Sequence, residues 1–106
     1  MNRGELWTVS GGVYATKPRP ALIIQDDLFS PTESVVVIPL TTAVADAPIT
    51  RVAVPTTTGI AQPSFAMIDK ITTVRRSNLG VRVGRVPTTV MADIERSLMV
   101  FLGLVS

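Results

Sequence analysis

Apolar and polar residues follow the pattern of short β-strands along most of the chain, either alternating or forming brief apolar runs. The segment 34–40 is a run of β-branched residues without alternation, which predicts a strand buried on both faces. We expect strands at residues 5–9, 19–25, 34–40, 50–55, 64–68, 71–74 and 81–86. Gly11, Gly12 and Pro18 predict a loop over residues 10–18.

The period changes near the end of the chain, where Val90, Ile94 and Leu98 recur at helical spacing. Thr88 is a suitable N-cap and Gly103 a suitable stop for this helix. Closely spaced short strands followed by one helix predict a mainly β fold, a small and strongly bent antiparallel barrel with a C-terminal helix. The length of 106 residues suits one domain, residues 1–106, with a single core.

One arginine has an unusual setting, in the segment Lys17-Pro18-Arg19-Pro20 directly before the apolar run of residues 21–24. Prolines on both sides hold the backbone extended, so we expect Arg19 at the start of a buried strand. A guanidinium with five donors in a fixed plane suits a phosphate. The alternative is an ordinary surface arginine that precedes an edge strand.

Composition narrows the classes of function. The chain is 46% hydrophobic and 17% charged, which predicts an apolar surface that self-association covers. No apolar run approaches the ~20 residues that span a bilayer, and the first residues do not form a signal peptide. We therefore expect no membrane association, and the absence of cysteine fits the cytoplasm.

The sequence contains neither cysteine nor histidine, which excludes a structural zinc site and acid–base catalysis by histidine. We expect no metal and no cofactor. The net charge of +2 favours anionic partners only weakly.

Several motifs, taken in order, resemble the MazF/PemK toxins, the growth-arresting halves of bacterial type II toxin–antitoxin modules. The resemblance covers nearly the whole chain. It is carried by Arg3-Gly4-Glu5-Leu6-Trp7, by residues 19–27 beginning Arg19-Pro20-Ala21, by Val37-Ile38-Pro39-Leu40-Thr41-Thr42, by residues 64–71, and by Val83-Gly84-Arg85-Val86 before the helix.

The resemblance implies an SH3-like barrel, a homodimer and metal-independent cleavage of single-stranded RNA at short specific sequences. It also implies an antitoxin, a small acidic protein that covers the active surface. The family's paired catalytic residues correspond to Arg19 and Thr41.

The chemistry of RNA is compatible with such a site, because the 2′-hydroxyl can attack the neighbouring phosphate without a protein nucleophile. The protein must orient the strand and stabilise the charge on the pentacoordinate phosphorus. Cleavage would leave a 2′,3′-cyclic phosphate and a 5′-hydroxyl. The group that accepts the 2′-hydroxyl proton is not identified by the sequence, since a guanidinium is a poor base. For Thr41, the alternative is a strand-end threonine that bonds the local backbone.

Further residues are candidates for RNA contacts rather than for chemistry. Asp69 matches an acidic position that some relatives use in the site, and a turn-forming role fits it equally. Two residues earlier, where one relative has an arginine, this chain has Met67. Strand alternation places Arg82 on a solvated face, where it would help modestly. The candidate contacts are Tyr14, Lys17, Gln25, Thr42, Asp69, Lys70 and Arg82.

The first loop departs from the family pattern, because residues 10–18 are few and contain no carboxylate. No glutamate there can act as an acid or base, and a shorter loop implies a different base specificity. Tyr14 could stack on a base, worth ~1–3 kcal/mol, or pack over the barrel mouth.

Two other functions are compatible with such a barrel. A gyrase poison of the CcdB kind shares the fold and cuts nothing, but its action depends on a tryptophan at the end of the last helix. Here the only tryptophan is Trp7, and the chain ends in Phe101-Leu102-Gly103-Leu104-Val105-Ser106. A non-catalytic SH3-like adaptor would need an aromatic-rich groove, and 5% aromatic residues argue against it.

Overall fold

The computed structural model describes residues 1–11 and 15–105. Within them, the chain forms seven strands and one α-helix, with short 3₁₀ turns between strands. The strands are β1 (Glu5–Gly11), β2 (Ala15–Ile23), β3 (Ser34–Thr41), β4 (Arg51–Val54), β5 (Ser64–Met67), β6 (Thr72–Arg75) and β7 (Leu79–Arg85), and the helix is α1 (Thr88–Phe101). The turns are η1 (Asp27–Phe29), η2 (Thr56–Thr58), η3 (Ile68–Lys70) and η4 (Arg76–Asn78). The predicted mainly β fold with a C-terminal helix is confirmed.

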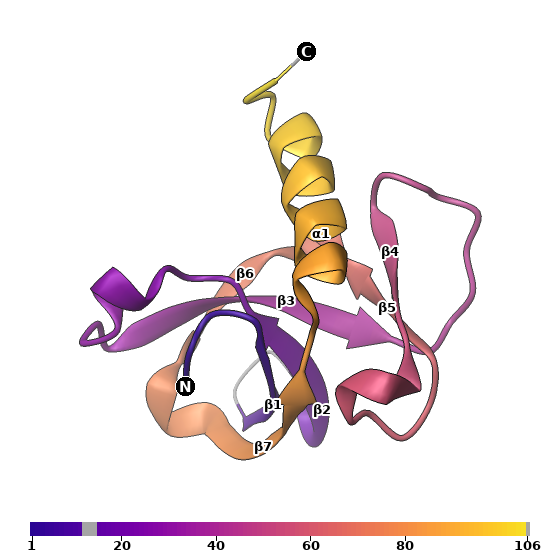
Figure 1. Cartoon of the computed structure of the whole chain (residues 1–106). Coiled ribbons are helices and arrows are strands. Elements are labelled where there is room, and N and C mark those ends of the chain that lie inside the picture. The colour runs from indigo at the N-terminus through magenta and orange to yellow at the C-terminus, as the bar shows by residue number, and fades with distance from the viewer. Residues whose placement is uncertain (12–14, 106) are drawn as a thin grey trace.

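All strand pairs are antiparallel, in the order β4-β5-β3-β2-β1-β7, and β6 pairs with β3 beside β5. Strands β7, β1, β2, β3 and β6 curl around one another at one end of the molecule (Figure 1). Strand β3 therefore lies at the centre of the fold, paired with β2 along one edge and with β5 and β6 along the other.

The two faces of the curled sheet bury two separate apolar clusters, because side chains alternate along each strand. On β2, Leu22 belongs to a helix-side cluster with Ile38 of β3 and Ile94 of α1, all fully buried. The neighbouring Ala21 and Ile23 belong to a barrel cluster, which comprises Val9, Ala21, Ile23, Val35, Val37 and Val74. Strand β3 contributes to both clusters, which confirms the prediction that it is buried on both faces.

The predicted loop over residues 10–18 is wrong at both ends. Strand β1 continues to Gly11 and β2 already begins at Ala15, with Gly11 paired to Ala15. Arg19 therefore lies within β2, opposite Val9, and not at the start of a strand. Pro18 and Pro20 do not prevent this, because the edge of β2 that pairs with β1 uses the N–H groups of other residues and needs none from the prolines.

Helix α1 starts one residue earlier than predicted. Its N-cap is Pro87, which has no side-chain acceptor, so Thr88 is the first helical residue and not the cap. The predicted stop at Gly103 is confirmed: this residue has φ 73°, its N–H donates to Val100 O at 3.1 Å, and Leu104 N–H donates to Met99 O at 2.8 Å. The last turn of α1 rises clear of the strands (Figure 1).

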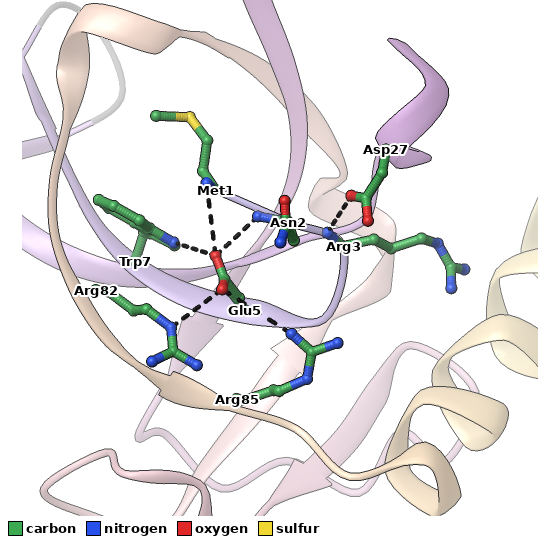
Figure 2. A network of polar contacts seen from close by, with 8 residues as sticks. All are labelled: Met1, Asn2, Arg3, Glu5, Trp7, Asp27, Arg82 and Arg85. Atoms are coloured by element: carbon green, nitrogen blue, oxygen red, sulfur yellow. Dashed lines mark hydrogen bonds and ion pairs between the residues drawn. The ribbon is translucent and has the colours of Figure 1, made fainter. Parts of the chain in front are cut away.

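A buried carboxylate holds β1 to β7. Glu5 is only 9% exposed. Its Oε1 accepts hydrogen bonds from Asn2 N–H at 2.8 Å and from the Trp7 indole N–H at 3.0 Å (Figure 2). Its Oε2 lies 3.2 Å from Nε of Arg82 and 3.9 Å from a guanidinium nitrogen of Arg85. Burial alone would raise the pKa of Glu5, but the two hydrogen bonds, the amino group of Met1 and Arg82 together hold it below its ordinary value.

The pKa of Glu5 is lower in the folded than in the unfolded protein. The carboxylate therefore stabilises the fold fully at pH values above the unfolded pKa, and this stabilisation is lost as the pH falls through the folded pKa. We expect Glu5→Gln to cost ~1–3 kcal/mol of unfolding free energy at pH 7, since the buried donors lose a charged acceptor. Urea unfolding at several pH values should show the two proteins converging below about pH 4. A difference that stays constant from pH 7 to pH 3 would contradict this role.

Candidate active site

The backbone of β2 directs alternate residues toward its two neighbouring strands. Gly4 N–H donates to Ile23 O at 2.8 Å. The backbone N–H and C=O groups of Ile23, and of every second residue before it in β2, therefore point toward the N-terminal segment and β1. Ile24 N–H donates to Val36 O at 3.1 Å, so the backbone groups of the even-numbered residues point toward β3. Both prolines beside Arg19 are even-numbered, so their backbone nitrogens lie on the side of β3.

Three prolines end the pairing of β3 in this region. Pro18 and Pro20 offer no N–H toward β3, and the ladder between β2 and β3 ends at the pair Ala21–Pro39. Pro39 faces the opposite edge, where β6 pairs with β3 up to Val37 and β5 pairs only from Leu40 onward. Missing donors thus coincide with gaps on both sides of β3.

A groove of about 340 Å³ opens where the strands separate. By alternation, Arg19 and Pro39 have their side chains on the same face as Ala21 and Val37, the face of the barrel cluster. The groove is lined by Arg19, Pro39, Leu40, Met67, Lys70, Thr72 and Thr73.

Thr41 is the last residue of β3 and is partly exposed. Its Oγ1 accepts a hydrogen bond from Ala43 N–H at 3.1 Å, which leaves the hydroxyl proton free for another acceptor. If the register of β2 and β3 continued two residues beyond Ala21–Pro39, Arg19 would face Thr41. Thr41 is not among the residues that line the groove, although Leu40 beside it is.

The positive charge of the groove is not compensated. Most other cations lie against carboxylates, including Arg3 with Glu95 (2.6 Å) and Arg96 with Asp93 (3.3 Å). Among the residues that the structure describes, Arg19 and Lys70 form no ion pair, and no carboxylate lines their groove. Two free cations beside neutral and apolar side chains suit an anionic ligand.

Comparison with known proteins identifies the family. The family model described as PemK-like, MazF-like toxin of type II toxin–antitoxin system matches residues 2–102. The chain belongs to this family. A probable endoribonuclease MazF of Mycolicibacterium smegmatis is 50% identical over 107 residues, covering 98% of each chain. Endoribonuclease MazF6 of Mycobacterium tuberculosis is 33% identical over 112 residues, again covering 98% of each.

Solved structures agree with this family assignment. An endoribonuclease in complex with its cognate antitoxin, from a mycobacterial species, superimposes with a TM-score of 0.87 at 26% identity, covering 100% of this chain and 98% of that one. A MazE–MazF complex of Deinococcus radiodurans has a TM-score of 0.81 at 20% identity, covering 99% and 98%, and shows the shared fold alone. The gyrase-poison alternative is not favoured, since the matching family and the named relatives are MazF toxins.

Within this MazF-like chain, two candidate RNA contacts take part in internal structure. The Asp69 carboxylate is paired with the Arg51 guanidinium, which fits its turn-forming role. The Gln25 amide donates to Phe29 O (2.8 Å) and accepts from Val36 N–H (3.1 Å), so it closes the connection between β2 and β3.

The remaining candidates are scattered. Lys17 and Thr42 are exposed, on β2 and just after β3, while Arg82 on β7 belongs to the Glu5 network. Tyr14 lies outside the described residues. Of the candidates that the structure describes, only Arg19 and Lys70 line the same groove.

Several groove residues were not predicted, namely Met67, Thr72 and Thr73, and neither was the ion-pair partner Arg51. Pro39, a proline inside the predicted strand, is the signal in the sequence that could have pointed to a gap in the pairing there. Within the described part of the chain, no group of three acidic side chains could hold a metal ion, and no helix has the length and apolar character to cross a membrane.

Proposed function

We propose that this chain is the toxin of a type II toxin–antitoxin module and a metal-independent endoribonuclease that cleaves single-stranded RNA. The observation that supports this most is the groove beside β3, where Arg19 and Lys70 lie and where no carboxylate is found among the described lining residues. A phosphodiester is the anion that the family's activity would bring there. We further propose that residues 1–106 act as one toxin domain.

In this proposal, the RNA supplies its own nucleophile, the 2′-hydroxyl adjacent to the scissile phosphate. Arg19 donates to the non-bridging phosphate oxygens and stabilises the charge that develops on them. Thr41 donates its free hydroxyl proton to the same phosphate, with Oγ1 held in place by Ala43 N–H. The products are a 2′,3′-cyclic phosphate and a 5′-hydroxyl.

A direct test is incubation of the purified protein with a long single-stranded RNA in EDTA. Discrete fragments with 2′,3′-cyclic phosphate ends are expected, and mapping their 5′ ends gives the cut sequence. An intact RNA, or fragments that form only with added metal, would refute the proposed activity.

Thr41→Ala is expected to slow cleavage by about 100-fold, the cost of one preorganised donor. Thr41→Ser should retain much of the activity, because it keeps the hydroxyl that both Ala43 N–H and the phosphate use. Single-turnover rates on a defined RNA measure both. Equal rates for Thr41→Ala and Thr41→Ser would indicate that the hydroxyl serves only the local backbone.

We propose two protein partners. A small acidic antitoxin would bind over Arg19 and Lys70, driven by complementary charge. A second copy of the chain would cover the exposed apolar end of α1, whose residues include Met99, Val100, Phe101, Leu102 and Leu104.

Light scattering at micromolar concentration should give twice the chain mass, and an acidic protein from the adjacent reading frame should co-purify and inhibit cleavage. A monomer at all concentrations would contradict the proposed dimer, and an adjacent protein that does not bind would contradict the proposed antitoxin.

Since the RNA substrate is cytoplasmic and the chain has no cysteine to oxidise, we propose that the protein acts in the cytoplasm.

A further inference from the structure

In the proposed cleavage, no residue has yet been assigned to protonate the leaving group. When the bond between phosphorus and the 5′-oxygen breaks, that oxygen becomes a strongly basic alkoxide unless it receives a proton. General acid catalysis of such a step typically contributes ~10²–10⁴-fold in rate. Neither Arg19 nor Thr41 fits this need, since arginine does not release its proton in proteins and a threonine hydroxyl is a weak acid.

The groove beside β3 contains one further ionisable side chain among its described lining residues. Besides Arg19, the lining consists of apolar residues, two threonines and Lys70. A lysine ammonium has three N–H donors and carries a transferable proton at neutral pH. Lys70 forms no ion pair with any described residue, so its ammonium is available to a ligand in the groove.

The turn that carries Lys70 is held firmly from behind. Ile68 is fully buried in the helix-side cluster, and its N–H donates to Thr50 O at 3.0 Å. Asp69, the next residue, is paired with Arg51, whose guanidinium also donates to Thr50 O at 2.9 Å. These contacts hold η3 in place between β5 and β6, at the gap where neither strand pairs with β3. Asp69 is thereby occupied by Arg51, and the following residue, Lys70, lines the groove.

The geometry points to Lys70 as the general acid of the reaction, a role that rests on the proposed ribonuclease function. The 2′-oxygen forms a bond to phosphorus and its proton passes to water. The bond between phosphorus and the 5′-oxygen breaks, its electron pair stays on that oxygen, and Nζ of Lys70 gives the oxygen a proton. Lys70 then regains a proton from water, while Arg19 holds the non-bridging oxygens throughout.

A sulfur substitution tests this assignment. In an RNA whose scissile 5′-bridging oxygen is replaced by sulfur, the leaving group is a thiolate, which departs without being protonated. Lys70→Gln should cleave the normal RNA at least ~100-fold more slowly than wild type under single-turnover conditions. On the sulfur-containing RNA, the same variant should cleave within about 5-fold of the wild-type rate, because no acid is required.

A second variant separates charge from proton transfer. Lys70→Arg keeps the positive charge but not an acidic proton, so it should bind RNA like wild type, stay slow on the normal substrate and regain its rate on the sulfur substrate. Arg19→Ala is the matched control and should be slow on both substrates, because phosphate charge must be stabilised in either case.

The contrary outcomes are distinct. If Lys70→Gln is slowed equally on both substrates, Lys70 binds the phosphate and donates no proton to the leaving group, and the inference is wrong. It is equally wrong if Lys70→Gln or Lys70→Arg cleaves normal RNA at the wild-type rate. Failure of the wild-type protein to cleave either RNA would instead refute the proposed ribonuclease function.

Discussion

Arg19→Ala is expected to lower the rate of RNA cleavage by at least ~100–1,000-fold, the cost of losing preorganised donors to a developing phosphate charge. The fold should be unchanged, because the Arg19 side chain is exposed and forms no ion pair with the described residues. The backbone of β2 stays extended through Pro18 and Pro20, which the substitution does not touch. Single-turnover cleavage and circular dichroism measure the two effects separately.

Arg19→Lys should recover little of this rate, because a point charge cannot reproduce two parallel N–H donors on one phosphate. Arg96→Gln is a suitable control, since it also removes one exposed guanidinium, here paired only with Asp93 on the same helix. It should cleave at the wild-type rate. If Arg19→Ala cut RNA as fast as Arg96→Gln, the proposed catalysis by Arg19 would be untenable.

The strands were largely predictable from the sequence, because one period of alternation determines which side chains each face buries. Residues 34–40 were correctly predicted to be buried on both faces, as the two clusters on either side of β3 show. The boundaries at residues 10–18 were not predictable in the same way. Glycines and a proline favour a loop locally, whereas pairing of Gly11 with Ala15 and of Arg19 with Val9 is decided by the neighbouring strand.

The candidate site was predictable in part. The setting of Arg19 between prolines is local, so the sequence alone pointed to it, and the family resemblance paired it with Thr41. The groove shared by Arg19 and Lys70 is not local, because it depends on β5, η3 and β6 lying along one edge of β3. The ion pair between Asp69 and Arg51 likewise requires β4 to lie beside β5, and the spacing of the two residues along the chain does not predict it.

The largest loss of stability is expected for Gly84→Ala, at a point where two backbones touch. A Cβ at Gly84 would lie 1.7 Å from Thr58 O and 3.1 Å from the Cα of Gly59, which are backbone atoms that cannot rotate away. Gly59 has φ 113°, and a Cβ there would in turn lie 2.5 Å from Val83 O. Turn η2 therefore packs directly on β7, and this contact joins the β4–β5 end of the sheet to β7.

To admit one methyl group at Gly84, either η2 or β7 must move, and β7 is held to β1 by the pair Gly84–Leu6. We expect Gly84→Ala to cost ~3 kcal/mol or more of unfolding free energy, the upper part of the range for overpacking. At roughly 4–8 °C per kcal/mol for a domain of about this size, Tm should fall by about 12–24 °C. Urea and thermal unfolding measure both quantities.

Gly103→Ala is the matched control, because it adds the same methyl group where nothing lies within 4 Å. Its cost should come only from the left-handed backbone at φ 73° and amount to ~1–2 kcal/mol. The comparison separates steric contact between two segments from the conformational preference of glycine. If Gly84→Ala were no less stable than Gly103→Ala, the backbones at η2 and β7 would have room to separate, and their contact would contribute little to closing the fold.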